Sequence, residues 1–211
     1  MSDVTKFINA IAKPKLPGMH NPWSQTCDTE VDTEKGYLAR RQRLRHHLEC
    51  PDPRILIIGE APGYQGCRFS GIAFTSERLL LEGSIPRVPD MHGKRITTRK
   101  LPWSEPSATI VWKALYEHGL ADNAVLFNAV PWHPEGLKKA LSNRTPNTME
   151  KEQGVKFLLM FLNLFDGVPV AALGNTASEN LNQLDIKHTK LRHPANGGAT
   201  LFREGLKQFV K

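Results

Sequence analysis

The sequence contains few cysteines, no long apolar run and no internal repeat. Its three cysteines, Cys27, Cys50 and Cys67, are an odd number without a CxxC pair. Neither a disulfide framework nor a zinc or iron–sulfur site therefore has its usual spacing. The absence of a run of about eighteen apolar residues excludes a transmembrane helix. The N-terminus lacks an apolar core followed by a small-residue cleavage site. These absences indicate a reduced, cytoplasmic protein.

The composition is that of a globular chain with a basic surplus. The 211 residues, 40% hydrophobic and 23% charged, are enough for one domain with a sizeable core. Twenty-eight Lys+Arg against twenty-one Asp+Glu give a net charge of +7, which favours a polyanionic partner such as nucleic acid. Basic residues cluster at 40–47 (RRQRLRHH) and 87–100. Each cluster could instead be an ordinary solvated surface.

Short apolar runs alternate with segments of helical periodicity. Strands are predicted at 55–59, 124–130, 169–174 and 186–191. Helices are predicted at 30–48, 107–118, 148–164, 175–184 and 198–210, with Ser107 and Asn175 as N-caps of two of them. This alternation predicts an α/β fold with a mainly parallel four-stranded sheet. The proline-rich segment 83–106 is predicted to be a long functional loop.

Ligands of open α/β folds bind outside the carboxyl ends of the strands. That rule points to four segments, 60–74, 128–134, 174–175 and 193–198. The first of them follows a buried strand with the letters GEAPGYQG, which match neither a GxGxxG fingerprint nor a P-loop. A cradle for nucleotide phosphates is therefore not supported.

Each polar candidate in these segments has a plain structural alternative. Glu60 is either a functional carboxylate or an exposed loop acid, and Phe74 is either a ring for stacking or part of the core. Asn128 could pair with the amide edge of a base or bond a neighbouring loop. His193 could stabilise a developing anion or be structural. His133 is interpreted as a satisfied surface histidine.

Taken together, the segments resemble the uracil-DNA glycosylase superfamily over residues 54–211. GEAPG resembles the first motif in the form of the iron–sulfur branch, and SGIAF resembles the segment whose Phe stacks on uracil. The other resembling segments, in chain order, are LPWSEPSATIVWKAL, VLFNAV, NRTPNTMEKE, ALGNTA and LRHPANGG.

The resemblance implies one domain, residues 1–211, with a three-layer α/β/α architecture, in which an N-terminal helical extension, 1–53, packs on the motif-bearing core, 54–211. It implies a monomeric hydrolase, a monofunctional DNA glycosylase that removes uracil or a related deaminated base from DNA without metal or organic cofactor. The implied catalytic residues are His193 and, for orienting water, Glu60. The implied base-binding residues are Gly59, Ala61, Pro62, Gly63, Phe74 and Asn128. The implied DNA-binding residues are Ser107, Gly174, Asn175, Asn196, Gly197, Lys94, Arg95 and Arg99.

The sequence departs from the superfamily pattern at four places. Ala61 stands where several branches have the Asp or Asn that acts on water, and the four cysteines of the iron–sulfur branch are missing. Gly63 replaces the bulky side chain that excludes thymine, and Asn196-Gly197-Gly198 replaces the larger residue that some members wedge into the duplex.

Two other functions stay open on the sequence alone. One is a protein of the same fold that binds nucleic acid or a nucleobase without cutting, which the missing carboxylate at Ala61 favours. The other is an α/β enzyme that acts on a free nucleotide, against which the basic segments count.

Overall fold

A computed structural model of the chain describes residues 1–27, 32–88 and 95–209. Its centre is a four-stranded sheet in the order β3-β2-β6-β7, in which all neighbours are parallel. The strands are β2 (Ile55–Gly59), β3 (Ala124–Asn128), β6 (Val170–Leu173) and β7 (Thr189–Leu191). The predicted sheet is confirmed, although β7 begins three residues later than expected.

The five predicted helices are present, four of them within one residue of the predicted ends in the described part of the chain, while α2 begins six residues later than predicted. They are α2 (Gly36–Leu48), α5 (Pro106–Glu117), α6 (Thr148–Leu164), α7 (Asn175–Gln183) and α8 (Ala199–Phe209). The bounds of α6 agree with the prediction because Asn147 and Glu150 form a reciprocal capping box at its start. Three further helices, α1 (Asp3–Ile11), α3 (Cys67–Ser70) and α4 (Glu77–Leu81), complete the helices of the described residues.

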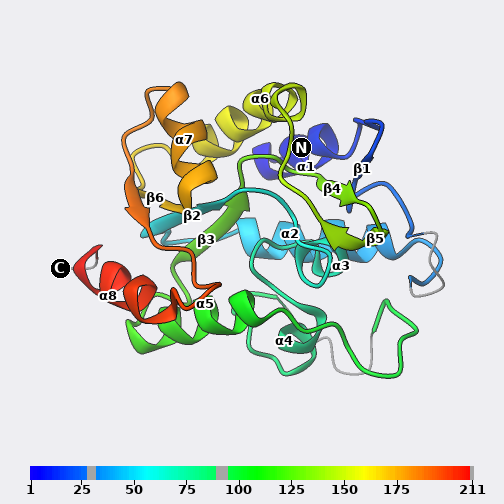
Figure 1. The fold of residues 1–211 in the computed structure, drawn as a ribbon, viewed down its shortest axis with the longest axis horizontal. Coiled ribbons are helices and arrows are strands. Elements are labelled where there is room, and N and C mark those ends of the chain that lie inside the picture. Colours follow the sequence, from blue (N-terminus) through cyan, green and yellow to red (C-terminus); the bar gives the residue numbers. More distant parts are fainter. Residues whose placement is uncertain (28–31, 89–94, 210–211) are drawn as a thin grey trace.

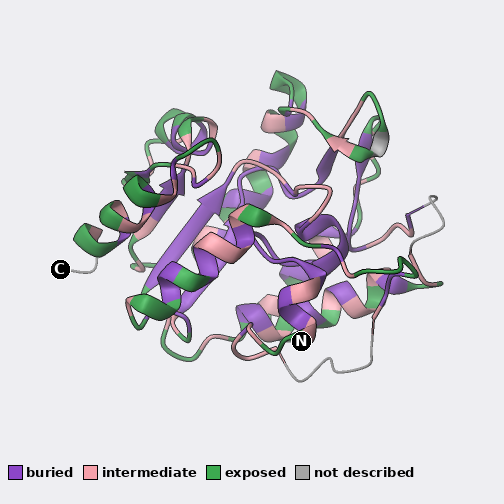
Figure 2. Cartoon of the chain, turned by 60° about the horizontal axis from the view of Figure 1, so that its bottom comes forward, coloured by how far each residue is buried: buried purple, intermediate pink, exposed green. Residues whose placement is uncertain are grey.

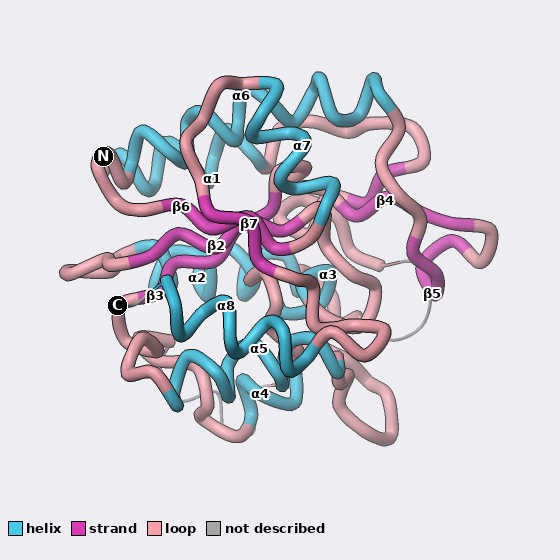
Figure 3. The backbone as a smooth tube through the Cα atoms, turned by 60° about the vertical axis from the view of Figure 1, so that its left-hand side comes forward, coloured by secondary structure: helices cyan, strands magenta, loops and turns pink. Residues whose placement is uncertain are grey.

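Helices cover both faces of the sheet and make three layers (Figures 1 and 3). On one face, α1, α6 and α7 pack on side chains such as Leu56 and Phe127. On the other face, α5 and α8 pack on Ile57 and Leu126. The central strands β2 and β3 are buried throughout, while exposed residues follow the outer sides of the helices (Figure 2). The three-layer α/β/α architecture is therefore confirmed.

A second, small sheet lies beside the first motif and was not predicted. It has the order β1-β4-β5 and is antiparallel, with β1 (Met19–His20), β4 (His133–Gly136) and β5 (Lys139–Asn143). The strands have two to five residues and contain Pro134 and Gly136, so they lack the apolar alternation that marks a strand. The β4–β5 pair is a hairpin with a two-residue turn.

The buried side of α2 differs from the predicted one. The helix begins at Gly36 rather than in the segment 30–35, of which residues 30 and 31 lie outside the described part, and Leu38 is exposed. The basic side chains of Arg40 and Arg43 are buried instead. Arg40 forms a bidentate ion pair with Asp32, at 2.9 and 3.0 Å. Basic residues on a helix read as a solvated or phosphate-binding face, but two of these arginines stabilise the interior.

The first fifty residues are hydrogen-bonded into the sheet and its loops. The indole N–H of Trp132 donates to the carbonyl oxygen of Ile11 at 2.9 Å. The buried His47 accepts, through Nε2, the backbone N–H of Leu126 in β3 at 2.9 Å. No helix of the described residues is long and apolar enough to span a membrane.

Candidate functional site

A pocket of about 490 Å³ opens at the carboxyl ends of the parallel strands. Most of the predicted catalytic and base-binding side chains line it, together with several of the predicted DNA-binding ones. They are Glu60, Ala61, Pro62, Gly63, Phe74, Asn128, Ser107, Gly174, Asn175 and His193. Residues more than a hundred positions apart thus meet because adjacent parallel strands end at one edge of the sheet.

Gly59, the last residue of β2, fixes how closely the pocket residues approach one another. It is paired in register with Asn128 of β3. A Cβ atom at position 59 would stand 2.6 Å from Oδ1 of Asn128 and 2.6 Å from Cζ of Phe74. Only glycine therefore leaves room for both side chains, which explains its position at the end of an otherwise apolar strand.

Asn128 offers a polar edge to the pocket. The residue is only 3% exposed, yet within the described part of the chain its side-chain amide forms no hydrogen bond. Buried amides normally have partners. A free donor and a free acceptor at the floor of a pocket therefore fit a ligand that carries the complementary pair.

Phe74 is held in a conformation that its residue type rarely adopts. Its φ of 49° lies in the left-handed region, which costs free energy for a residue with a bulky side chain. The ring lines the pocket, and its centroid is 6.1 Å from that of His193, with the rings inclined at 49°. Phe74 and His193 thus form two walls of one site.

The surroundings of His193 determine both its charge and which ring nitrogen carries the proton. Nδ1 accepts the backbone N–H of Ala195 at 3.1 Å. Burial lowers the pKa of the imidazole, and the charge of Arg192 lowers it further, so the ring is neutral near pH 7. Since Nδ1 is an acceptor, the proton of the neutral ring is on Nε2. His193 therefore offers an N–H donor that no group in the described residues occupies.

The N-termini of α5 and α7 also line the pocket. Ser107 and Asn175 are predicted as N-caps, but the caps are Glu105 and Gly174, so α5 starts two residues and α7 one residue earlier than that prediction requires. Neither cap makes a side-chain hydrogen bond to its helix, and no acidic residue lies in either first turn. Their free backbone N–H groups and dipoles favour anions such as phosphate.

The loop of the first motif is held by backbone contacts. The N–H of Val130 donates to the carbonyl oxygen of Glu60 at 2.9 Å. The prediction that His133 lies at the surface is wrong, because it is fully buried and its Nδ1 lies 2.7 Å from the carbonyl oxygen of Pro62. Burial lowers the pKa of His133 to about 4, so this histidine is neutral and positions the loop.

Glu105 is a pocket carboxylate that the sequence reasoning missed. Its Oε2 is buried without a hydrogen-bond partner, and Oε1 is 2.9 Å from where a Cβ of Gly63 would stand. Gly66 also has no room for a side chain beside this carboxylate. Burial raises the pKa of Glu105 to about 7. The signal in the sequence is a lone acid between Ser104 and Pro106, which is too weak to single out.

The segment NRTPNTMEKE supplies pocket residues as well. Asn143 accepts the backbone N–H of Tyr64 through Oδ1 at 2.9 Å, which ties this segment to the first-motif loop. Arg144 binds Glu150 through two hydrogen bonds of 2.6 Å and lines the pocket beside Asn143. The resemblance had marked this segment, but no role had been predicted for its residues.

Five predicted DNA-binding residues lie away from the pocket lining or outside the described residues. Asn196 and Gly197 are exposed in the turn after His193, both with positive φ. Arg95 pairs with the buried Glu77 at 3.5 Å, and Arg99 lies over the ring of Trp103 at 3.9 Å. Lys94 falls outside the described residues.

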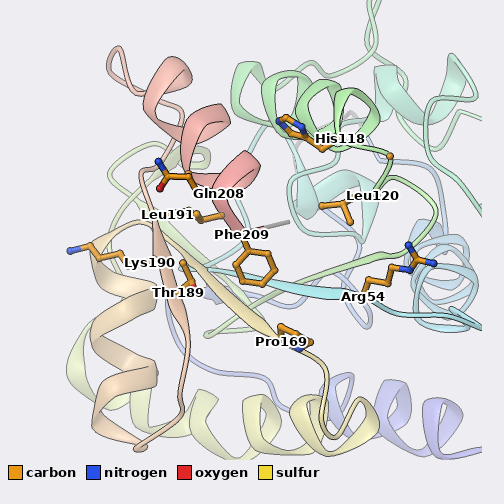
Figure 4. A pocket seen from close by; sticks show the side chains of 11 residues that line it. Arg54, His118, Leu120, Pro169, Thr189, Lys190, Leu191, Gln208 and Phe209 are labelled. Atoms are coloured by element: carbon orange, nitrogen blue, oxygen red, sulfur yellow. The ribbon is translucent and has the colours of Figure 1, made fainter. Parts of the chain in front are cut away.

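The pocket at the carboxyl ends is not the largest cavity. A cavity of about 620 Å³ lies at the opposite, amino-terminal edge of the sheet, where Arg54, Pro169 and Thr189 precede or begin their strands (Figure 4). None of the predicted site residues lines it. Among the described residues no group of three or more His, Cys, Asp or Glu side chains is placed to hold a metal ion.

Comparisons with known proteins agree with the fold and with the family that the sequence resembles. The family model described as the uracil DNA glycosylase superfamily matches residues 46–210. The crystal structure of wild-type SMUG2 from Pedobacter heparinus superposes with a TM-score of 0.68 at 18% sequence identity. That likeness covers 100% of this chain and 96% of the other. A search of curated proteins finds no match.

Proposed function

The chain belongs to the uracil DNA glycosylase superfamily, and from that premise we propose that it hydrolyses the N-glycosidic bond of uracil, or of a related deaminated base, in DNA. It acts as a monomer on a base that has been flipped out of the stack, and it leaves an abasic site. The observation that carries this proposal is the pocket in which the unpartnered amide of Asn128 faces the same space as Phe74 and the neutral His193.

The flipped base is held between a ring and an amide. Phe74 stacks on its face, and Asn128 pairs with N3–H and O4, for which it has a matching acceptor and donor. Gly59, Ala61, Pro62 and Gly63 form the surface against which the base lies. These contacts offset the few kcal/mol that unstacking and unpairing cost.

His193 stabilises the leaving group. When the N1–C1′ bond breaks, negative charge develops on the base and positive charge on the sugar. The Nε2–H of the neutral ring donates a hydrogen bond to O2 as that charge appears. One such donor is worth about 3–4 kcal/mol in comparable anion-stabilising sites.

A carboxylate orients the water that attacks C1′. Ala61 provides no polar group for this role, but Glu60 precedes it and is half-buried at the pocket. Glu60 aligns the water and favours the cationic sugar. Glu105 is a second carboxyl in the same pocket, and a base with a pKa near neutrality suits proton abstraction from water. Single-turnover rates of Glu60→Gln and Glu105→Gln identify which of the two acts.

The DNA backbone lies across the rim of the pocket. The free N–H groups of α5 and α7, with Ser107, Gly174 and Asn175, bind the phosphates that flank the flipped nucleotide. Asn196 and Gly197 contact the duplex from the turn after His193. Arg95 and Arg99 are further candidate phosphate contacts, and Lys94, which lies outside the described residues, stays a prediction.

The test is strand cleavage by alkali after incubation with oligonucleotides that contain one uracil, compared with thymine, hypoxanthine and xanthine. Alkali-labile sites at uracil, lost in His193→Ala, support the proposal. Tight binding without base release favours a binding protein of the same fold, for which Ala61 is the argument. Activity on free nucleotides with no effect on oligonucleotides favours an enzyme of small molecules.

A further inference from the structure

The β4–β5 hairpin carries a fully exposed leucine at its tip. Its turn consists of Leu137 and Lys138, and Leu137 has a relative exposure of 105%. No other large hydrophobic side chain of the described residues is as exposed. Figure 3 shows the hairpin apart from the four-stranded sheet, at the edge of the molecule. Exposed apolar side chains are common singly, so the position of this one has to carry the argument.

The hairpin stands directly beside the pocket. Pro134 of β4 and Asn143 of β5 both line the pocket, at the base of the hairpin. Leu137 follows Pro134 by three residues, which in a strand span at most about 10 Å. Successive base pairs are about 3.4 Å apart along a strand. The tip is therefore within one to three base-pair steps of a nucleotide held in the pocket.

The backbone of the hairpin is anchored both at its turn and at its base. The backbone N–H of Lys138 donates to Oγ of Ser142 at 2.9 Å, and β4 pairs with β1 on its other side. At its base, Arg144 donates to the carbonyl oxygen of Glu135 at 3.0 Å and is itself held by Glu150. An anchored backbone loses less conformational entropy on insertion into another structure than a free loop would.

The loop after His193 offers no large apolar side chain for this purpose. Its turn consists of Ala195, Asn196, Gly197 and Gly198. A nucleotide that leaves the stack opens a gap between its neighbours, and proteins fill such gaps with leucine, phenylalanine and other apolar wedges. Exposed Lys138, next to the leucine, supplies the positive charge that a phosphate backbone attracts.

We propose that the β4–β5 hairpin inserts Leu137 into the base stack of duplex DNA beside the flipped nucleotide, with Lys138 on the adjoining phosphate. This inference rests on the proposed function, because it takes the flipped base to be in the pocket at the base of the hairpin. The insertion matters only where a partner strand competes for the base. Single-stranded DNA has no pair to break, so the hairpin acts on duplex substrates.

The experiment compares Leu137→Ala with the wild type in single turnover on one uracil-containing strand, alone and paired opposite guanine. The duplex carries 2-aminopurine next to the uracil, whose fluorescence rises when it is unstacked. We expect Leu137→Ala to lower the duplex rate at least about tenfold, to leave the single-strand rate within about twofold, and to abolish the fluorescence rise. Leu137→Phe should restore both duplex signals. Leu159→Ala, at a partly exposed leucine of α6, is the matched control and should change none of them.

Equal rates for Leu137→Ala and the wild type on the duplex would overturn the inference, as would an equal loss on both substrates. A change in sedimentation mass on substitution would also overturn it, because the leucine would then cover a second copy of the chain. If the wild type releases no base from the single strand or from the duplex, the proposed function fails. The 2-aminopurine fluorescence then decides by itself whether Leu137 is inserted. A rise that requires Leu137 supports insertion without cleavage, and no rise refutes it.

Discussion

We expect Glu105 to lower the free energy of unfolding as the pH rises from about 4.5 to about 7, and Glu105→Gln should remove that fall. Burial raises the pKa of the carboxyl from 4.5 to about 7, so between these values the folded state holds a proton that the unfolded state has released. Stability from this group is fully present below pH 4.5 and is lost as the pH rises through 7. The difference between these two pKa values corresponds to a loss of about 3 kcal/mol in the free energy of unfolding. The buried Oε2 lacks a partner that would offset the cost of its charge.

The measurement is urea unfolding of the wild type and Glu105→Gln at pH 5 and pH 8. An amide imitates the protonated acid, so the two proteins should differ by less than about 1 kcal/mol at pH 5. At pH 8 the variant should be more stable by up to about 3 kcal/mol. Glu204→Gln, at an exposed position of α8, is the control and should show one constant difference at both pH values. A difference for Glu105→Gln that does not change with pH would refute the reasoning.

Three further predictions concern the reaction. His193→Ala should lower the single-turnover rate by about 10²–10³-fold, the effect of losing one donor to a developing anion, with little change in DNA affinity; parallel losses of both would indicate a positioning role. Asn128→Asp should weaken the use of uracil, because a carboxylate repels O4 and cannot donate to it, and unchanged base preference in competition assays would remove Asn128 from recognition. Glu60→Gln should lower the single-turnover rate by about a hundredfold or more with base affinity nearly intact. The reason is that a carboxylate about 4 Å from the cationic sugar is worth up to about 4 kcal/mol. A loss below about threefold would mean that another group orients the attacking water.

The sequence was sufficient to predict the sheet and most of the pocket, because both depend on local patterns. Apolar runs such as 55–59 identify the strands, and parallel pairing brings their carboxyl ends together. Glu105 could not be found in this way, since its burial arises where the start of α5 meets the first-motif loop. The interior role of Arg40 was equally hidden, because it depends on Asp32, a residue outside the helix.

The small sheet shows the limit of periodicity in another way. β4 contains a proline and a glycine, and its pairing is irregular between Glu135 and Gly136. The strand β4 forms because β1 and β5 pair with it on its two sides. Its own residues do not show a strand pattern. Pairing of this kind is decided by tertiary contacts, which a reading of single segments does not include.

The hydrogen bonds of the N-terminal segment distinguish the range of the family match from the part of the chain that folds together. The family match begins at residue 46, but Trp132, close to the end of β3, donates to Ile11, and the indole of Trp23 donates to Gly71 between the first motif and Phe74. The family model thus covers less of the chain than these hydrogen bonds join, whereas the likeness to SMUG2 covers all of it. A fragment that begins at residue 46 would leave the buried indole N–H of Trp132 without its acceptor and the carbonyl oxygen of Gly71 without its donor. Anyone who grafts this pocket onto another scaffold has to carry the first forty-five residues along with it.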